Sequence, residues 1–285
     1  MASTREARIT MTLGNLNSSN GGLALGTSAG AAVRLREVCK KFDGGIDAIG
    51  GVNLSVAPEE FVSIVGSSGC GKSTLLRIIA GLVPSTGGTV EVHGEPVMAP
   101  RRDVGMMFQR PALLAWKTSL ENVLLPLRMR RTVQVSDLED ALRLLDLFHL
   151  GGFEHHFPRQ LSGGMQQRVA LARLMMTGAD VRLLDEPFGA VDELTRELLN
   201  LELLKIHDRT ASATIFVTHN ISEAVLLSDR ILVMSPRPGM IAADIPVPLE
   251  RPRSPEMAYS TAFQKIALKV RYHIQLSQSE RGMTG

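Results

Sequence analysis

One stretch decides the fold: Phe61-Val62-Ser63-Ile64-Val65-Gly66-Ser67-Ser68-Gly69-Cys70-Gly71-Lys72-Ser73-Thr74. Its first five residues form a short apolar run that predicts a buried strand, and a helical run follows over residues 75–80. Residues 66–73 between them fit the pattern G-x-x-x-x-G-K-S, which is typical of a phosphate-binding loop, or P-loop. The strand before the loop and the helix after it favour this interpretation over a glycine-rich turn that matches by chance.

Each residue type in the loop has a task in binding phosphate. The glycines let successive N–H groups surround an anion, Lys72 can reach the terminal phosphates of a nucleotide, and the Ser73 hydroxyl can ligate Mg²⁺. Cys70 is expected to contribute only its backbone, because no resolving thiol lies near it in the sequence. We predict that the nucleotide is bound by Gly66, Ser67, Ser68, Gly69, Cys70, Gly71, Lys72, Ser73 and Thr74.

The composition is ordinary for a soluble globular protein with a substantial core. The chain has 285 residues, of which 44% are hydrophobic and 21% are charged. Its 31 Lys and Arg residues nearly balance its 29 Asp and Glu residues, so no basic field indicates a nucleic-acid partner. The two cysteines, Cys39 and Cys70, fit a reducing compartment rather than a disulfide framework. No apolar run approaches the roughly 20 residues that span a bilayer, so any membrane role is expected to need a partner.

Residues 1–31 are predicted to be a flexible extension. Residues 9–33 carry no charged side chain and are rich in Gly, Ser, Asn and Thr. A signal peptide is one alternative, since Arg5 and Arg8 precede this segment, but residues 14–22 interrupt any apolar core. A misassigned start of the chain is the other alternative.

Strand and helix signals alternate in the second half of the chain. Strand signals over residues 181–184, 214–217 and 231–234 are separated by helical runs over residues 192–207 and 222–227. This alternation predicts an α/β fold in which helices cover a largely parallel sheet.

Two further regions flank this core. Short alternating strands are predicted between residues 33 and 97. The period turns helical from residue 120 to about residue 160, within a helical subdomain predicted over about residues 110–165. In this helical block Ser136 and Glu139 are expected to form a capping box. Its apolar face is predicted to hold Leu138, Leu142 and Leu145.

The C-terminal region, residues 251–285, is predicted to be a helix and tail that follow a domain spanning residues 32–250. Ser254-Pro255 is typical of a helix start. The apolar face of this helix is predicted to hold Phe263, Ile266, Val270 and Ile274.

Two acidic residues follow the apolar run at residues 181–184. Asp185 can hold Mg²⁺ through water, and Glu186 can polarise an attacking water as a general base. Alone, the pair is equally consistent with two acidic residues that end a strand and cap the next helix. A P-loop in the same chain favours the catalytic interpretation.

Two neutral side chains complete the candidate site. His219 ends the next strand, so it is expected at the same sheet edge, where it can hydrogen-bond a phosphate or orient water. Gln109, after the strand-like residues 104–108, can reach Mg²⁺ or the attacking water. Either residue alone would be an ordinary structural His or loop Gln.

Residues 161–168, Leu-Ser-Gly-Gly-Met-Gln-Gln-Arg, form a second phosphate-seeking element. Ser162 can cap the following helix, and Gly163 and Gly164 allow another body to approach the exposed N–H groups. Phe42 has two interpretations: it stacks on adenine, which we favour, or it is a core residue at a strand end.

Together these motifs resemble those of the nucleotide-binding subunits of ABC transporters, over about residues 33–285. Phe42 stands where the adenine-stacking aromatic residue would be, Gln109 is similar to the Q-loop glutamine, and residues 161–167 resemble the signature motif. The resemblance implies a P-loop NTPase fold with a mostly parallel RecA-like core sheet, an antiparallel β subdomain and a helical subdomain.

The later motifs follow in the same order. Asp185 and Glu186 resemble the Walker B pair, residues 189–192 the D-loop, and His219 the switch histidine. The resemblance implies an ATP hydrolase whose catalytic residues are Lys72, Gln109, Glu186 and His219, and whose Mg²⁺ is held by Ser73, Gln109 and Asp185.

The family also implies why one chain carries two phosphate-seeking elements. Two subunits pair head to tail as a homodimer, and each ATP lies between the P-loop of one subunit and the signature of the other. Ser162, Gly163, Gly164 and Gln166 would then contact the nucleotide of the partner. ATP closes the dimer, and hydrolysis opens it.

Further segments narrow the resemblance to bacterial importers of the nitrate/sulfonate/taurine class. These are residues 108–116, 186–190 and 234–239, with the C-terminal helix. The class implies an integral-membrane permease, a periplasmic or lipid-anchored solute-binding protein, and a peripheral location at the cytoplasmic face of the inner membrane. The chain departs from the usual pattern at Ala115 (Pro), Val191 (Leu) and Asn220 (Asp).

Two other functional classes stay open at this point. A soluble ABC ATPase can act on a non-transport partner such as the ribosome or DNA, but the chain has neither a second cassette nor a long coiled coil. A regulatory module that has lost turnover is disfavoured by the intact Lys72, Asp185, Glu186 and His219.

Overall fold

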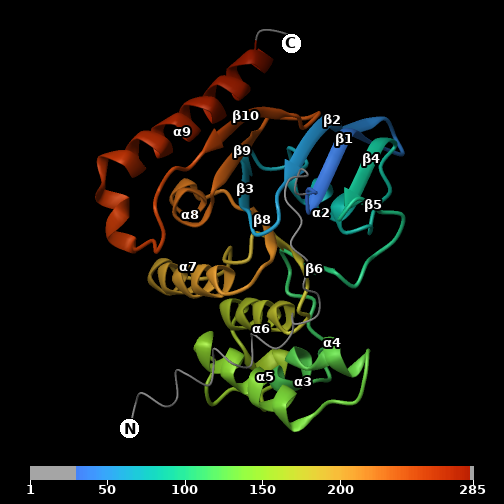
Figure 1. The fold of residues 1–285 in the computed structure, drawn as a ribbon, viewed down its shortest axis with the longest axis vertical. Coiled ribbons are helices and arrows are strands. Elements are labelled where there is room, and N and C mark those ends of the chain that lie inside the picture. The colour runs from blue at the N-terminus through green and yellow to red at the C-terminus, as the bar shows by residue number, and fades with distance from the viewer. Residues whose placement is uncertain (1–29, 283–285) are drawn as a thin grey trace, which may run out of the picture.

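The computed structural model describes residues 30–282. The predicted extension therefore lies outside the described residues, apart from its last two positions. Figure 1 shows two sheets in the upper part of the molecule, the long α9 along one side, and a group of helices at the opposite end.

The smaller sheet is antiparallel, with the strand order β2-β1-β4-β5. Its strands are β1 (Val33–Phe42), β2 (Ile46–Val56), β4 (Gly87–Val92) and β5 (Glu95–Pro96). Val33, Leu35 and Val38 of β1 are buried, whereas Arg36 and Glu37 between them are exposed. The alternation read from the sequence thus places apolar side chains on the face toward the core.

The larger sheet has six strands in the order β10-β9-β3-β8-β7-β6. Its strands are β3 (Phe61–Gly66), β6 (Val104–Met107), β7 (Val181–Asp185), β8 (Ala213–Val217), β9 (Arg230–Met234) and β10 (Ile241–Pro246). All neighbouring pairs are parallel except β9 and β10. Every residue of β7 and β8 is buried, as expected for strands covered on both faces. The predicted fold class is confirmed.

Helices cover both faces of the larger sheet and form the lower end of the molecule in Figure 1. They are α2 (Lys72–Ile79), α3 (Ser119–Val123), α4 (Leu125–Arg128), α5 (Val135–Leu147), α6 (Gly163–Met175), α7 (Glu193–Asp208), α8 (Ile221–Leu227) and α9 (Thr261–Gly282). Two 3-10 helices are η1 (Pro158–Gln160) and η2 (Pro255–Tyr259). Helices α3 and α5 contact α6, and α6 contacts β6, so the helical end joins the sheet through α6.

The predicted start of α5 was wrong. The Asp137 carboxylate accepts from the Gln134 N–H at 2.7 Å and pairs with Arg131, so the helix begins one residue before Ser136. The hydrogen bond from Arg131 holds the pKa of Asp137 below its ordinary value. The apolar face was wrong in part: Leu145 is buried, but Leu138 and Leu142 are exposed, because Ala141 and Leu145 mark the side that faces the core.

The C-terminal helix also starts later than predicted. Ser254-Pro255 leads into η2, and the Ser260 hydroxyl then accepts from the Phe263 N–H at 3.2 Å, at the true start of α9. Its predicted apolar face is confirmed. Phe263 and Val270 are fully buried in a cluster with α8, β9 and β10, which anchors α9 to the sheet.

Candidate active site

Four neighbouring strands deliver the predicted site residues to one edge of the larger sheet. The order β3-β8-β7-β6 places their carboxyl ends side by side. The P-loop follows β3, His219 follows β8, Asp185 ends β7, and Gln109 follows β6. Ligands bind at this edge in open α/β sheets.

The backbone of the P-loop needs glycine. Gly69 and Gly71 have φ of 74° and 114°, in the left-handed region that other residues avoid. A Cβ on Gly71 would also lie 2.7 Å from Ile49 Cδ1 and 2.8 Å from the Ala48 carbonyl oxygen. Glycine at positions 69 and 71 therefore allows the tight backbone turn in which successive N–H groups surround an anion.

Lys72 is held against the loop that precedes it. Its Nζ donates to the carbonyl oxygens of Gly66 and Ser67, at 2.9 Å each, and the residue is 6% exposed. Cys70 is buried, with its Sγ 3.8 Å from Lys72 Nζ. The ammonium thus lies against the backbone of the predicted phosphate-binding loop.

A turn after β9 supports the P-loop from outside, which the sequence did not indicate. Arg237 Nε donates to the Gly69 carbonyl at 2.6 Å. A Cβ on Gly239 would lie 2.2 Å from the Cys70 carbonyl oxygen, so the turn packs directly on the loop. The segment noted for its resemblance to one class of importers therefore has a structural task at the phosphate-binding loop.

Asp185 and Ser73 form an oxygen-rich pair behind the loop. Ser73 Oγ donates to Asp185 Oδ1 at 2.8 Å. Burial raises the pKa of Asp185, and the Ser73 hydrogen bond opposes this rise. Oδ2 of Asp185 is buried and has no hydrogen-bond partner. An orphaned carboxylate oxygen beside a hydroxyl fits the donor set of a hard cation such as Mg²⁺.

Glu186 brings three distant parts of the chain together. Its Oε2 accepts from Gln109 Nε2 at 3.2 Å and lies 3.6 Å from His219 Nδ1. Its φ is 48°, an uncommon conformation for Glu that tends to mark functional positions. Its N–H donates to the Val217 carbonyl at 3.0 Å, which fixes this conformation against β8. A carboxylate with two nitrogen groups around it can position a water molecule and accept its proton.

The signature segment begins α6 as predicted. Ser162 is the N-cap, and its Oγ accepts from the Met165 N–H at 3.2 Å. A Cβ on Gly164 would lie 3.2 Å from the Ala190 carbonyl oxygen, so the segment touches the D-loop, residues 189–192. Within residues 30–282 no hydrogen bond joins residues 162–164 to the P-loop.

The two glutamines of this segment point in different directions. Gln166 Nε2 donates to the Pro158 and Leu161 carbonyls, at 2.9 and 3.3 Å. This residue, predicted to contact the nucleotide, thus stabilises the segment that precedes α6 in its own subunit. Gln167, which the sequence analysis missed, is 4% exposed. Its Oε1 accepts from the Ala190 N–H at 3.0 Å, and its Nε2 donates to the Gln109 carbonyl at 3.5 Å. It could have been found, since it shares the buried face of α6 with apolar residues three and four positions later.

Phe42 lies on the surface, not in the core. It ends β1, its side chain is 41% exposed, and Lys40 Nζ is 5.1 Å from the ring centroid. The alternative interpretation as a core residue is therefore excluded, and adenine stacking stays a prediction.

Known proteins share this sequence and fold. The profile of the family described as ABC transporter matches residues 49–189. An aliphatic sulfonates import ATP-binding protein, SsuB of Bacillus cereus, is 40% identical over 241 residues, covering 84% of this chain and 94% of that protein. The chain belongs to the ABC transporter family. It is an ATP-binding ATPase whose hydrolysis is coupled to transport, and a non-transport role is not favoured.

Two other matches support this assignment of the ABC ATPase. A taurine import ATP-binding protein, TauB of Rhizobium johnstonii, is 44% identical over 198 residues, or 70% of this chain and 76% of that protein. A solved structure described as dimeric, in a post-hydrolysis state of the ATP-binding cassette MJ0796 with ADP and Pi, has a TM-score of 0.70. It is 34% identical and covers 76% of this chain and all of that chain. The predicted family, fold and enzyme class are confirmed.

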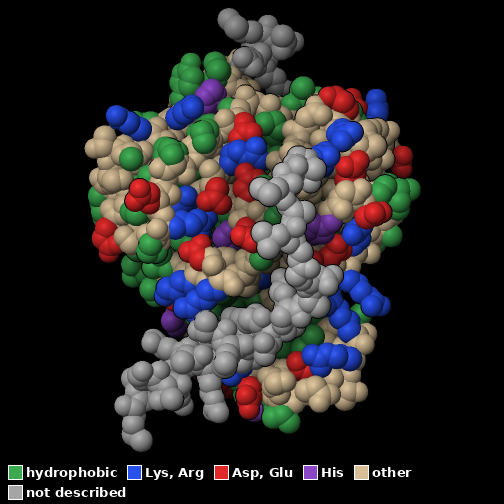
Figure 2. Space-filling model, viewed as in Figure 1, with side chains coloured by type: hydrophobic (Ala, Val, Ile, Leu, Met, Phe, Trp, Pro, Cys, Tyr) green, Lys and Arg blue, Asp and Glu red, His purple; other side chains and the backbone are tan. Residues whose placement is uncertain are grey.

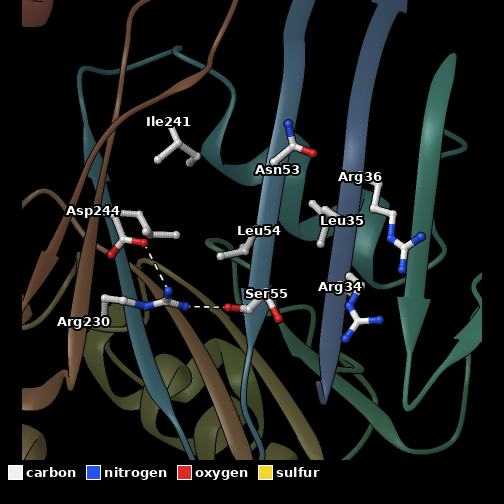
Figure 3. A pocket seen from close by; sticks show the side chains of 10 residues that line it. Arg34, Leu35, Arg36, Asn53, Leu54, Ser55, Arg230, Ile241 and Asp244 are labelled. Carbon is white, nitrogen blue, oxygen red and sulfur yellow. Dashed lines mark hydrogen bonds and ion pairs between the residues drawn. The ribbon is translucent and has the colours of Figure 1, made fainter. Parts of the chain in front are cut away.

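A hollow elsewhere in this ABC ATPase is structural. It has a volume of about 340 Å³, is lined from β1, β2, β9 and β10, and includes none of the predicted site residues. Figure 3 shows Arg230 spanning it between the Asp244 carboxylate, at 3.1 Å, and the Ser55 carbonyl. The bond to Ser55 joins the larger sheet to the smaller one, so the Arg230 side chain is engaged in the packing of the fold.

The departure at Asn220 is conservative in its local role. Asn220 is the N-cap of α8, and its Oδ1 accepts from the Glu223 N–H at 3.2 Å. Asn and Asp serve about equally well as N-caps. The ABC ATPase therefore keeps the cap beside His219 without the negative charge that an Asp would add there.

Proposed function

We propose that this ABC ATPase powers bacterial import of a small taurine-like or aliphatic sulfonate through a separate permease. The names of the taurine and aliphatic-sulfonate import relatives support the solute class. The arrangement of Glu186 with Gln109 and His219 at the sheet edge carries the proposal of active turnover. Within the described residues no helix has the length and apolar character to cross a bilayer. From the import ATP-binding relatives we infer a peripheral position at the cytoplasmic face of the inner membrane, held by the permease.

The site residues divide the work of hydrolysis. The P-loop N–H groups and Lys72 bind the phosphates, and Lys72 offsets charge on the terminal phosphate as the bond to it breaks. Glu186 accepts the proton of the attacking water, and His219 and Gln109 hold that water in line. Phe42 stacks on the adenine.

Mg²⁺ would be held by Ser73 Oγ, the Asp185 carboxylate and the Gln109 amide oxygen. The buried, unpartnered Asp185 Oδ2 supports this assignment. When bound, Mg²⁺ neutralises charge on the transferred phosphate. The Ser73 hydroxyl would ligate the ion with a lone pair, and its proton could stay on Asp185 Oδ1.

The active site is composite in this proposal. Ser162, Gly163 and Gly164 contact the terminal phosphate of ATP on the partner subunit of a homodimer, with Gln166 beside them. A helix N-terminus with exposed N–H groups suits an anion, and α6 is long enough to offer a dipole. The dimeric neighbour with ADP and Pi supports the formation of a dimer. We further propose residues 32–250 as the ATPase domain, with its helical subdomain over about residues 110–165 and the C-terminal helix and tail over residues 251–285.

One experiment tests the transport assignment. The gene is deleted from its host, and growth is measured with sulfate, taurine or an alkanesulfonate as the only sulfur source. Growth on a sulfonate should fail and return with the wild-type chain, but not with Lys72→Ala, while growth on sulfate is unchanged. Normal growth of the deletion strain on all sulfonates would overturn the solute class. Capture of a soluble complex in place of a multi-span permease would favour the non-transport alternative.

Surface charge agrees with a protein partner rather than nucleic acid. On the described part of the face in Figure 2, Lys and Arg side chains are interspersed with Asp and Glu. No single-sign field is visible there, in keeping with the net charge of +2. We infer that recognition of the permease depends on local shape more than on long-range steering.

A further inference from the structure

A buried carboxylate lies directly behind the switch histidine. Glu223, in the first turn of α8, is 6% exposed. Its Oε2 accepts from Thr218 Oγ1, and Thr218 Oγ1 in turn accepts from the Asn220 N–H at 3.0 Å. These bonds hold the chain on both sides of His219. The direction in which His219 leaves the end of β8 thus depends on the Glu223 carboxylate.

The same carboxylate faces a cation that holds the D-loop. Arg196 of α7 donates from Nη2 to the Val191 carbonyl at 2.7 Å, and its Nε lies 3.7 Å from Glu223 Oε1. Val191 belongs to the loop that follows Glu186, and the other side of that loop is held by Gln167. Arg196 is therefore the link between the segment after Glu186 and the segment that carries His219.

The contact between Glu223 and Arg196 is an ion pair in a poorly solvated place. Burial raises the pKa of Glu223, whereas the Thr218 hydrogen bond and the Arg196 charge lower it. Arg196 Nε is buried and has no hydrogen-bond partner, so the carboxylate is what compensates it. Removing one charge of such a pair leaves the other uncompensated in a poorly solvated place.

We propose that Glu223 is a positioning residue for ATP hydrolysis, which ties His219 through Arg196 to the D-loop. It fixes the relative position of Glu186 and His219, whose Oε2 and Nδ1 are 3.6 Å apart. Glu223 touches neither the P-loop nor the oxygen pair of Ser73 and Asp185. Its task is therefore in the geometry of hydrolysis and not in the binding of ATP.

The test is the variant Glu223→Gln, which keeps the size and an acceptor for Thr218 but loses the charge opposite Arg196. We expect kcat for ATP to fall at least about tenfold, while KM changes less than about twofold. The matched control is Glu202→Gln, on the same helix as Arg196, which removes an ion pair with Lys205 at 2.9 Å. The control should change neither constant.

A second variant measures the coupling. Arg196→Lys keeps the charge but offers one ammonium for two partners, so kcat should fall at constant KM here too. The double variant should be no slower than the slower single variant, since both break one link. In the Glu186→Gln background, Glu223→Gln should not slow residual hydrolysis further.

Thermal unfolding shows which variants are folded, and Arg196→Lys carries the test if Glu223→Gln is not. Three results would overturn the proposal. The first is a wild-type kcat in the folded variants. The second is a change mainly in the KM for ATP. The third is a double variant in which the reductions in kcat of the two single variants multiply.

Discussion

Replacing Glu186 by Gln removes one proton acceptor and little else. The amide has the size of the carboxylate and can keep one oxygen toward Gln109, 3.2 Å away. General base catalysis is typically worth about 10²–10⁴-fold in rate, or roughly 3–5 kcal/mol of barrier. Lys72 and Ser73 keep their contacts, so ATP affinity should change less than about threefold. The expected variant binds ATP normally and hydrolyses it at least about 100-fold more slowly.

Two assays check this expectation on the purified chain. Phosphate release is followed in a single turnover with enzyme in excess, and ATP affinity is measured by equilibrium titration. Size-exclusion chromatography with ATP should show a dimer that persists in Glu186→Gln and disperses in the wild type as ATP is consumed. Glu139→Gln, an exposed position of α5, is the control. Hydrolysis by Glu186→Gln within about tenfold of the wild-type rate would remove Glu186 from the role of base.

Three shorter predictions address the partner contact, the loop and pH. Ser162→Arg should reduce hydrolysis to background by placing a bulky side chain at the contact between subunits, with ATP binding by the monomer unchanged; lost monomer binding would refute the composite site. Gly71→Ala should abolish ATP binding in equilibrium titration because its Cβ meets Ile49 at 2.7 Å, whereas Gly94→Ala, at φ 79° in open space, should bind normally. Burial lowers the pKa of His207 to about 4 from 6.5, so the unfolded chain binds more protons between these values and stability is lost as the pH is lowered through this window. His207→Asn should remove up to about 3 kcal/mol of that loss in urea unfolding at pH 7 and pH 4, and an unchanged pH dependence would contradict this account.

The residues closest to the chemistry could be predicted because each is fixed by local sequence. A glycine loop between strand and helix, or an acidic pair at a strand end, has few structural solutions. The sequence also predicted that His219 shares a sheet edge with the P-loop, and the order β3-β8-β7-β6 confirms this. The edge strand β10 was not predicted, because Ile245 is its only fully buried residue and the apolar signal is weak.

The supporting residues could not be predicted because their partners lie far away in the chain. Arg196 and Glu223 stand on different helices, and nothing in either helix alone requires an ion pair. Leu138 and Leu142 were assigned to the buried face of α5, but that face is marked by Ala141 and Leu145, and the two leucines are exposed. The side of α5 that faces inward is set by its packing against α3 and α6, which the sequence of α5 alone does not show.

In the composite site that we propose, ATP hydrolysis by this chain requires a second copy, and the arrangement at the sheet edge supports this proposal. The fold brings phosphate-binding, metal-binding and base residues together through four adjacent strands. The signature segment stands on α6 instead, and it contacts the D-loop at Ala190. Gln167 joins that loop to the Gln109 segment, and Arg196 joins it to the segment of His219. In this proposal, a partner that binds the signature segment also contacts the D-loop. The D-loop is already connected to the segments of Gln109 and His219, the two residues proposed to hold the attacking water. We propose that docking of the partner is coupled to hydrolysis through the two side chains that hold the D-loop backbone. Loss of one of these hydrogen bonds should therefore slow turnover without weakening ATP binding.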